Sequence, residues 1–422
     1  IDRLARQGLK FTAGYTAAPN CAPTRAALMS GQYGPRTGVF TVNNLDRGPA
    51  HLRKLAPPRN NTNLPLDKVT IADRLKAAGY ATAIFGKWHL GEGEPYHPSR
   101  RGFDEALVSM GRHFDFKTDP PTSSTRPGEY LADFLTEQGL RFIERNKERP
   151  FFLYLPHFAV HVPHQAKAEL IAKYKGKRPA GGQRDPVYAA MIESVDQSVG
   201  RVLAKLDELG LSANTLVIFS SDNGGVGGYQ GAGLAGVRGD TDNAPLKGGK
   251  GMLYEGGVRV PLICRWPGVI KPGAVCDEPV ISVDFYPTFL ELAGAKLDPQ
   301  YLLDGVSFVP LLKSGGRSKL NREALYWHFP GYLESLDTNG RNHWRATPSG
   351  AIRVGDDKLI EYFEDGRIEL FDLKHDLGEQ TNLAAGRPDK AHALRARLAA
   401  WRQAVNAPMP QPNPKYDPSN SR

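Results

Sequence analysis

Residues 81–91 read ATAIFGKWHLG: a short apolar run closed by glycine, followed at once by charged and polar residues. Such a run is typical of a buried strand. The same order recurs in residues 151–157, FFLYLPH, and in residues 215–225, TLVIFSSDNGG. In open α/β sheets the ligand crevice lies at the carboxyl ends of the strands. These stretches therefore predict an α/β fold with a mostly parallel sheet and a functional site beside the ends of its strands.

Helical patterns alternate with these strands. Thr70 and Asp73 form a box typical of a helix start, and apolar residues continue the helix to Gly79. Residues 188–209 carry apolar side chains at alternating spacings of four and three, and Gly210 ends this long helix. Residues 1–7 resemble the end of a further short helix. The alternation of helices and strands supports the α/β class.

The pattern changes after about residue 315, and we expect a catalytic domain over residues 1–315. Short strands are predicted at 324–329, 351–354, 358–362 and 367–371, and a last helix at 394–405. Residues 316–406 thus read as a small α+β subdomain with an antiparallel sheet. Residues 407–422 are rich in Pro, Asn and Ser, which predicts an extended tail.

The composition is that of a globular protein, with 40% apolar and 23% charged residues among 422. A net charge of +9 is small for this length. The sequence has no basic run with interleaved aromatic residues, the pattern that would predict nucleic-acid binding. No apolar run is long enough to predict a membrane span. The three cysteines, Cys21, Cys264 and Cys276, lack zinc-site spacing, and Cys264 with Cys276 is the candidate for a single disulfide.

Residues 21–31, CAPTRAALMSG, are the most informative segment for function. A cysteine before a proline and a helix start is compatible with a low-pKa nucleophile, and alone also with an inert buried thiol. The segment resembles the signature of the type I sulfatases. GKWHLG at 86–91, SDNGG at 221–225, and GGKG with YEGGVR within 248–259 resemble that family's other motifs, in the same order. The resemblance covers nearly the whole chain and implies an alkaline-phosphatase-like α/β sandwich with helices flanking the sheet.

The resemblance implies that a maturation enzyme oxidises Cys21 to formylglycine, which hydrates to a geminal diol. One hydroxyl would attack sulfur, and the second would expel sulfate and restore the aldehyde. Because the anionic oxygens of a sulfate ester repel nucleophiles, catalysis needs a cationic cradle. A helix expected to begin near Thr24 would add free N–H groups to that cradle.

The resemblance implies roles for the residues of this sequence that match the family's motifs. Arg25 is expected to hold the formylglycine hydroxyl and to neutralise charge. Lys87 is expected to bind a sulfate oxygen, and His89 to take the proton of the second hydroxyl, whereas Trp88 packs.

Two further assignments have competitors nearby in the sequence. His161 is expected to bind sulfate or to protonate the leaving oxygen, with His157 and His164 as alternatives. Lys250 is expected to contact sulfate and help the leaving group, with Lys247 as the alternative and the expected surface residue.

Asp222 and Asn223 are the predicted metal ligands, since carboxylate and amide oxygens suit Ca²⁺, with Mg²⁺ possible. In the family two further acidic ligands come from a first strand, which would lie upstream of Ile1. We therefore expect that the natural N-terminus is missing, that the sheet lacks this strand, and that the chain alone binds metal weakly and has little activity.

Substrate specificity is only weakly encoded. We expect the loops 42–66 and 92–126 and the C-terminal strands to shape the pocket, with His328, Arg345 and His97 as candidate substrate residues. A sulfated carbohydrate, as a small molecule or an oligosaccharide, is the expected substrate, and an aryl sulfate a surrogate.

Two other functions remain open on the sequence. One is a phosphodiesterase or phosphonate monoester hydrolase on the same scaffold, and the other is an inactive fragment that binds sulfated glycans. The resemblance also implies export to the periplasm or secretion. The oligomeric state is not encoded in any motif.

Overall fold

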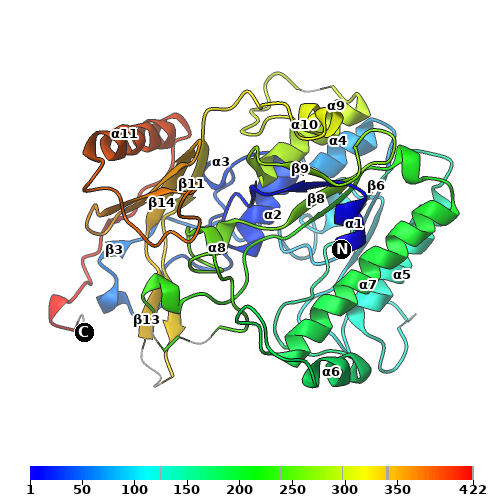
Figure 1. Ribbon diagram of the computed structural model, residues 1–422, viewed down its shortest axis with the longest axis horizontal. Helices are drawn as coiled ribbons and strands as arrows, with labels where there is room; N and C mark the ends of the chain where they lie inside the picture. The colour runs from blue at the N-terminus through cyan, green and yellow to red at the C-terminus, as the bar shows by residue number, and fades with distance from the viewer. Residues whose placement is uncertain (124, 235, 238, 297, 339–341, 421–422) are drawn as a thin grey trace.

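The computed structural model describes residues 1–420 except positions 124, 235, 238, 297 and 339–341. Strands form a central layer with helices on both faces, and a smaller sheet lies beside it under α11 (Pro388–Ala404) (Figure 1). The parallel strand pairs and the separate antiparallel sheet confirm the predicted α/β fold class.

The first sheet has the order β5–β4–β6, with bounds Glu105–Val108, Ala81–Gly86 and Phe151–Tyr154. Both pairs are parallel, and Ala81 is in register with Phe151. The carboxyl ends of β4 and β6 therefore lie side by side, as the backbone N–H of Lys87 shows by donating to the carbonyl of Pro156 at 2.8 Å. Both strands were predicted to within one residue.

Strand β4 is apolar throughout because helices cover both of its faces. Ile84 packs in one cluster with residues of α4 (Ile71–Ala77), and Phe85 packs in another with residues of α5 (Leu131–Arg145). Successive side chains of a strand point to opposite faces, so both kinds of position must be apolar. The predicted box before α4 is present, since Thr70 and Asp73 bond to each other's backbone N–H.

The second sheet has the order β7–β8–β1–β9, with bounds Val217–Ser220, Leu262–Arg265, Leu9–Phe11 and Ala274–Cys276. β1 pairs antiparallel with β8 and parallel with β9. It therefore lies between the predicted disulfide partners, with Leu9 opposite Cys264 and Phe11 opposite Cys276. Both cysteines are free thiols, so the predicted disulfide is wrong.

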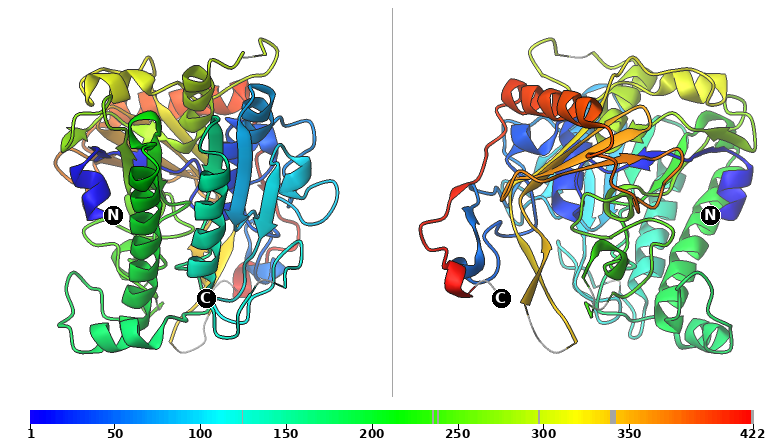
Figure 2. Two further views of the ribbon diagram at one scale, coloured as in Figure 1. Left: turned by 90° about the vertical axis from the view of Figure 1, so that its right-hand side faces the viewer. Right: turned by 60° about the vertical axis from the view of Figure 1, so that its left-hand side comes forward.

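A cavity of about 2020 Å³ lies between β6 and β7 and reaches under α7 (Pro186–Glu208). Half-buried apolar residues of α7, among them Val195, Val199 and Val202, line it together with both strands. Helix α7 runs beside α5 (Figure 2), and it agrees with the predicted helix to within two residues. The polar residues that follow β4, β6 and β7 border the same cavity.

Helix α2 (Cys21–Ser30) begins three residues earlier than the predicted start near Thr24. Asn20 is extended, at φ −136° and ψ 156°, so the helix starts directly after it. Pro23 does not interrupt the helix because residues of the first turn have no intrahelical N–H bond to lose. Gly31, in the left-handed region at φ 69°, ends the helix.

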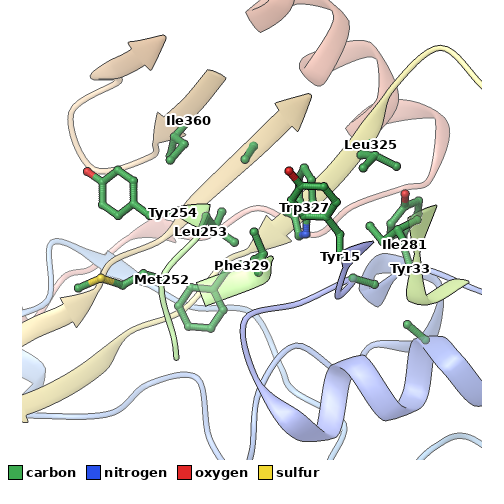
Figure 3. Close-up of a cluster of buried hydrophobic side chains, with 14 of the residues drawn as sticks. Tyr15, Tyr33, Met252, Leu253, Tyr254, Ile281, Leu325, Trp327, Phe329 and Ile360 are labelled. Atoms are coloured by element: carbon green, nitrogen blue, oxygen red, sulfur yellow. The ribbon is translucent and has the colours of Figure 1, made fainter. Parts of the chain in front are cut away.

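The C-terminal sheet has the order β11–β14–β15–β16, with bounds Leu325–Phe329, Ser349–Val354, Asp357–Tyr362 and Ile368–Asp372. All its pairs are antiparallel, as predicted. Ile352 and Leu359 pack beneath α11 on one face. Trp327 and Phe329 belong to the cluster drawn in Figure 3, which joins this sheet to Tyr15 of the central part. The indole N–H of Trp327 also donates to the carbonyl of Thr16 at 2.7 Å.

Two smaller strand pairs complete this side of the molecule. β12 (Leu333–Leu336) and β13 (Asn342–Ala346) form a hairpin that projects beyond the sheet (Figure 1). In the tail, β17 (Gln411–Pro412) pairs with β3 (Leu55–Ala56). The domain limits at 315 and 406 stay predictions.

The remaining helices and strands are α1 (Asp2–Arg6), α3 (Gly34–Thr37), α6 (Ala168–Lys175), α8 (Glu255–Val258), α9 (Phe285–Ala293), α10 (Val309–Ser314), β2 (Gly14–Tyr15) and β10 (Val280–Ile281). Helix α1 confirms the predicted short N-terminal helix. Within the described residues, no helix combines the length and the hydropathy that crossing a membrane requires.

Candidate active site

Cys21 is the first residue of α2, and its side chain is buried. The turn before it is held by the hydroxyls of Thr16 and Thr24, which donate to the carbonyl of Ala18 at 2.8 and 2.9 Å. The first turn of a helix has backbone N–H groups without intrahelical partners. Since Asn20, Cys21 and Thr24 line the cavity, an anion beside Cys21 would meet the positive end of α2.

Arg25 lies one turn further along α2 and is 6% exposed. Its Nε and Nη2 both bond to Oδ2 of Asp222, at 2.8 and 2.7 Å. Its Nη1 donates to the carbonyl of Lys87 and, at 3.4 Å, to the hydroxyl of Tyr154. One guanidinium therefore links α2, β4, β6 and the loop after β7, which brings the predicted sites together.

Lys87 and His89 follow β4 in a segment whose backbone has positive φ angles, which few residues other than glycine adopt. Gly86 has φ 136°, and a Cβ there would lie 2.1 Å from the carbonyl oxygen of Pro156. His89 itself has φ 63°, a conformation that turns its ring toward the cavity that it lines. Lys87 is buried, and in the described residues its ammonium has no carboxylate partner within ion-pair distance.

Burial and the nearby cations Lys87 and Arg25 lower the pKa of His89 to about 3. Its ring is therefore neutral at physiological pH. The buried Nδ1 has no hydrogen-bond partner among the described residues. A neutral imidazole beside several cations can accept a proton from a group bound in the cavity.

The structure separates the three candidate histidines after β6. His157 bonds through Nε2 to the hydroxyl of Ser198 at 2.8 Å, and His164 lies 3.5 Å from a carboxylate oxygen of Asp185. His157 and His161 both line the cavity, but Nε2 of His157 is taken by Ser198, whereas burial followed by the charge of Lys250 lowers the pKa of His161 to about 4. Its Nδ1–H donates to the carbonyl of Val162 at 2.9 Å, which leaves Nε2 available. The geometry favours His161 over the two alternatives.

Lys250 lies on a loop packed against the end of β7. Its N–H donates to the carbonyl of Gly225 at 2.9 Å, and its own carbonyl accepts from the hydroxyl of Tyr229 at 3.2 Å. Its side chain lines the cavity. Lys247 instead stacks on the ring of Tyr254, 4.4 Å from the centroid, and donates to the carbonyl of Glu379. It is thus half-buried and structural, rather than the surface residue that we expected.

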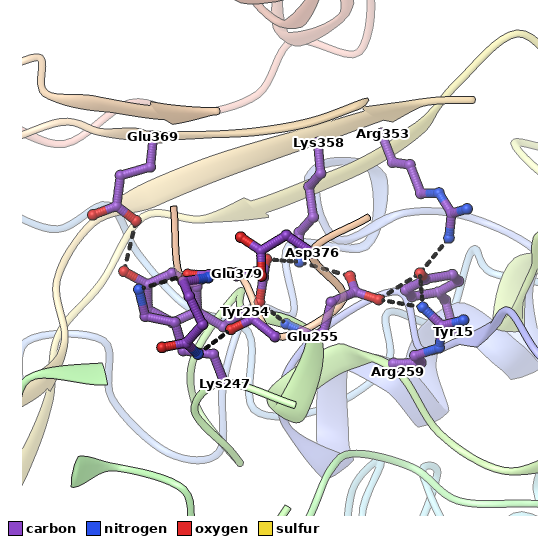
Figure 4. A network of polar contacts seen from close by, with 12 residues as sticks. Tyr15, Lys247, Tyr254, Glu255, Arg259, Arg353, Lys358, Glu369, Asp376 and Glu379 are labelled. Atoms are coloured by element: carbon purple, nitrogen blue, oxygen red, sulfur yellow. Dashed lines mark hydrogen bonds and ion pairs between the residues drawn. The ribbon is translucent and has the colours of Figure 1, made fainter. Parts of the chain in front are cut away.

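A buried ionic network fixes the end of this loop to the C-terminal sheet. Lys358 of β15 lies between Glu255 and Glu379, with N–O distances of 2.8 and 2.9 Å, and all three side chains are fully buried (Figure 4). Glu255 also binds Arg259 and the hydroxyl of Tyr15. The carboxylate of Glu379 in turn accepts from the backbone N–H of Glu255 at 2.6 Å. These contacts attach the end of the Lys250 loop both to β15 of the C-terminal sheet and to Tyr15 of the central part.

Asp222 and Asn223 follow β7 and border the cavity. Burial raises the pKa of Asp222, but the charges of Arg25, Lys87 and Lys250 outweigh it and hold the value at about 2. The side-chain oxygen Oδ1 of Asn223 is buried without a partner in the described part of the chain. A carboxylate beside an unpaired amide oxygen fits a hard cation, although these are only two of the oxygens that Ca²⁺ takes. The described residues contain no group of three or more His, Cys, Asp or Glu that could hold a metal.

Two of the three candidate substrate residues lie elsewhere. His328 is buried and bonds through Nε2 to the carbonyl of Pro408 at 2.9 Å, because its strand packs against the tail. His97 caps a short helical turn, with Nδ1 2.8 Å from the hydroxyl of Ser99. Neither lines the cavity, so both predictions are corrected, whereas Arg345 does line it.

Asn20 and Arg47 are among the polar cavity residues that were not singled out in the sequence. Asn20 precedes Cys21 and donates to the hydroxyl of Thr41 at 3.3 Å. Arg47 lies in the loop 42–66, which was expected to shape the pocket, but no local pattern distinguishes it from other arginines. Only the folded loop places it at the cavity.

Two family models match this chain. The model described as Sulfatase matches residues 1–295, and that described as N-sulphoglucosamine sulphohydrolase, C-terminal, matches residues 249–404. A protein named sulfatase from Formosa agariphila is 37% identical over 480 residues, which covers 97% of this chain and 83% of the relative. The steryl-sulfatase of Mus musculus is 32% identical, covering 91% and 74% of the two chains.

Solved structures agree with these relatives. The crystal structure of Ps i-CgsB in complex with k-i-k-neocarrahexaose superposes with a TM-score of 0.76 at 27% identity. The match covers 95% of this chain and 86% of that chain. Fold, cavity and relatives define a hydrolase of the alkaline phosphatase superfamily. This chain belongs to the sulfatase family, and its enzyme class is sulfuric ester hydrolase.

Proposed function

We propose that the chain hydrolyses sulfate monoesters with a formylglycine made from Cys21 by a maturation enzyme, assisted by a divalent cation. The observation that carries this proposal is the cavity itself. Cys21 at the start of α2 shares it with Arg25, Lys87 and Lys250, whereas Asp222 is the carboxylate beside them. A cavity with this excess of positive charge suits a bound sulfate.

When hydrated, the formylglycine would supply one hydroxyl to attack sulfur and a second to release sulfate. Arg25 would hold the group at position 21 from one turn along α2, with its charge balanced by Asp222. Lys87 and Lys250 would neutralise the sulfate oxygens from the ends of two different loops.

The two histidines would handle protons. Because His89 is neutral, it would accept the proton of the second hydroxyl at its ring nitrogen. His161 lines the cavity with Nδ1 bonded to Val162, and it would bind sulfate or exchange a proton with the leaving oxygen through Nε2. Lys250 would be a second donor for that oxygen.

Asp222 and the unpaired Oδ1 of Asn223 would hold the cation, for which Ca²⁺ is the first candidate and Mg²⁺ the second. The cation would supply additional positive charge beside the sulfate.

We propose a sulfated carbohydrate as the substrate class, with aryl sulfates as surrogates. The related structure that holds k-i-k-neocarrahexaose supports an oligosaccharide, and the steryl-sulfatase relative favours a sterol sulfate as the alternative. Export to the periplasm or secretion is part of the same proposal and rests on family resemblance.

The test compares hydrolysis of an aryl sulfate with that of an aryl phosphodiester. It uses the full-length natural protein, which is the wild type of all activity measurements proposed below, made with a formylglycine-generating enzyme and supplied with calcium. We expect sulfate release to dominate. Dominant phosphodiester cleavage would favour the phosphodiesterase or phosphonate hydrolase alternative. Binding of a sulfated glycan without turnover by protein shown to carry the modified residue would favour a binding function instead.

Binding of inorganic sulfate should weaken in alkaline solution earlier than an ordinary lysine would predict. Burial first, and then the charges of Arg25 and Lys250, lower the pKa of Lys87 below 10.5. Since the ammonium form binds the anion, the inhibition constant of sulfate should rise by up to about tenfold per pH unit above this lowered pKa. Steady-state inhibition between about pH 7 and pH 10 measures it. In Lys87→Arg the side chain keeps its charge over this range, so the inhibition constant should change less with pH than in the wild type. Equal pH dependence in the two proteins would contradict the assignment of Lys87 as a sulfate ligand.

A further inference from the structure

We propose that Arg345 and Arg47 form a binding subsite for a second anionic group of the substrate, a carboxylate or another sulfate on the same sugar chain. This inference rests on the proposed sulfatase function and specifies its substrate class. It begins from the position of Arg345 relative to Cys21.

Arg345 of β13 packs against the loop that carries Lys250. Its Nε would lie 3.1 Å from a Cβ placed on Gly251, the residue after Lys250. The N–H of Gly251 donates to the carbonyl of Pro19 at 2.9 Å, two residues before Cys21. A short chain of direct contacts thus joins the guanidinium to the proposed nucleophile, and Arg345 borders the cavity that holds it.

The guanidinium of Arg345 has little to satisfy it inside the protein. Nη1 donates to the hydroxyl of Tyr229 at 3.4 Å, and the charge lies 5.8 Å from the centre of that ring. Nε is buried without a hydrogen-bond partner, and no carboxylate pairs with this side chain among the described residues. Arg345 is half-buried and its Nε lacks a partner, so a bound anion would supply the counter-charge that the described residues do not.

Arg47 borders the cavity from the loop 42–66. Among the described residues its guanidinium donates to carbonyl oxygens, those of Asn44 and Val42. The next residue, Gly48, touches the ring of Trp344, since a Cβ there would lie 2.6 Å from that ring. This contact places the two segments side by side, whereas Trp344 and Arg345, as successive residues of β13, point to opposite faces of the hairpin. What Arg47 and Arg345 share is the cavity that both residues border.

The charge balance points to an anion rather than to sugar hydroxyls alone. A sulfate monoester carries one negative charge, which Lys87 and Lys250 already exceed, and Arg25 is paired with Asp222. Arg345 and Arg47 add two cations, against one further carboxylate near Tyr229, that of Asp240, which lies 3.8 Å from His164. A substrate with a second anion would satisfy them, and bidentate geometry suits guanidinium recognition of carboxylate or sulfate.

The experiment measures kcat/KM for three sulfate esters: an aryl sulfate, a neutral sugar monosulfate, and the same sugar with a second sulfate or a uronic carboxylate. We expect wild type to prefer the sugar with two anions. Arg345→Met and Arg47→Met should each lower kcat/KM for that sugar by about 10- to 100-fold, mainly through KM, and leave aryl sulfate turnover nearly unchanged. Arg345→Lys should restore part of the loss, and the exposed Arg178, which does not line the cavity, supplies Arg178→Met as control.

Three results would overturn the inference. Wild type could show no preference for the second anion, the loss could be equal on all three esters, or it could fall on both sugars alike. Equal losses would mean that Arg345 only positions the Lys250 loop through Tyr229, and losses on both sugars would mean contact with hydroxyls. The larger effect for a sulfate or for a carboxylate identifies the second group. Failure of wild type to hydrolyse the aryl sulfate would instead refute the proposed function itself.

Discussion

Cys21→Ala is expected to lower aryl sulfate turnover by about 10⁴-fold or more, because removal of a nucleophile leaves only binding and electrostatic stabilisation. The cavity should otherwise persist, since Arg25, Asp222 and Lys87 hold one another through their own contacts. The variant should therefore still bind sulfate. Turnover and sulfate binding measured on the same preparation check both expectations.

Cys276→Ala is the matched control for that variant. Cys276 is also buried and free, but it lies on β9, and burial raises the pKa of its thiol to about 11. The Cys276→Ala variant should keep the aryl sulfate turnover of the wild type. Retention of more than a tenth of the activity by Cys21→Ala would contradict a nucleophile at position 21.

Lys358→Met should destabilise the protein by about 3–5 kcal/mol, the usual cost of removing one partner from a buried ion pair. Glu255 and Glu379 would then face each other without the cation between them. Burial and the charge of Glu255 already raise the pKa of Glu379, so the variant should take up a proton there. Chemical denaturation of variant and wild type measures the difference.

Lys390→Met is the control, because Lys390 pairs with Asp357 at 2.9 Å on the surface of the same subdomain. Exposed pairs contribute about 0–1 kcal/mol. We also expect Lys358→Met to lower kcat, since Glu255 and Glu379 anchor the loop of Lys250. A loss as small as that of Lys390→Met would show that the network does not hold the fold.

Local patterns predicted many elements because their causes are local. The box at the start of α4 is local: Thr70 and Asp73 are three positions apart, and each side chain accepts from the other's backbone N–H. The spacing in α7 reflects its one apolar face, and the unbroken apolar run of β4 reflects burial on both faces. The start of α2 was misplaced although Asn is a favoured residue directly before a helix. Asn20 lies there with an extended backbone, but its side chain makes no capping bond and donates to Thr41 instead.

The sequence by itself determined the fold class, the nucleophile candidate at Cys21 and the polar clusters after three strands, because periodicity and motif order depend on neighbours along the chain. Only the tertiary structure favours His161 over its neighbours, and Lys250 over Lys247, for roles that stay proposals. Those choices depend on which side chains are already bonded to distant elements. The same holds for Arg47 and Arg345, which lie nearly 300 positions apart in the sequence and meet at one cavity because β13 packs against the loop after Thr41.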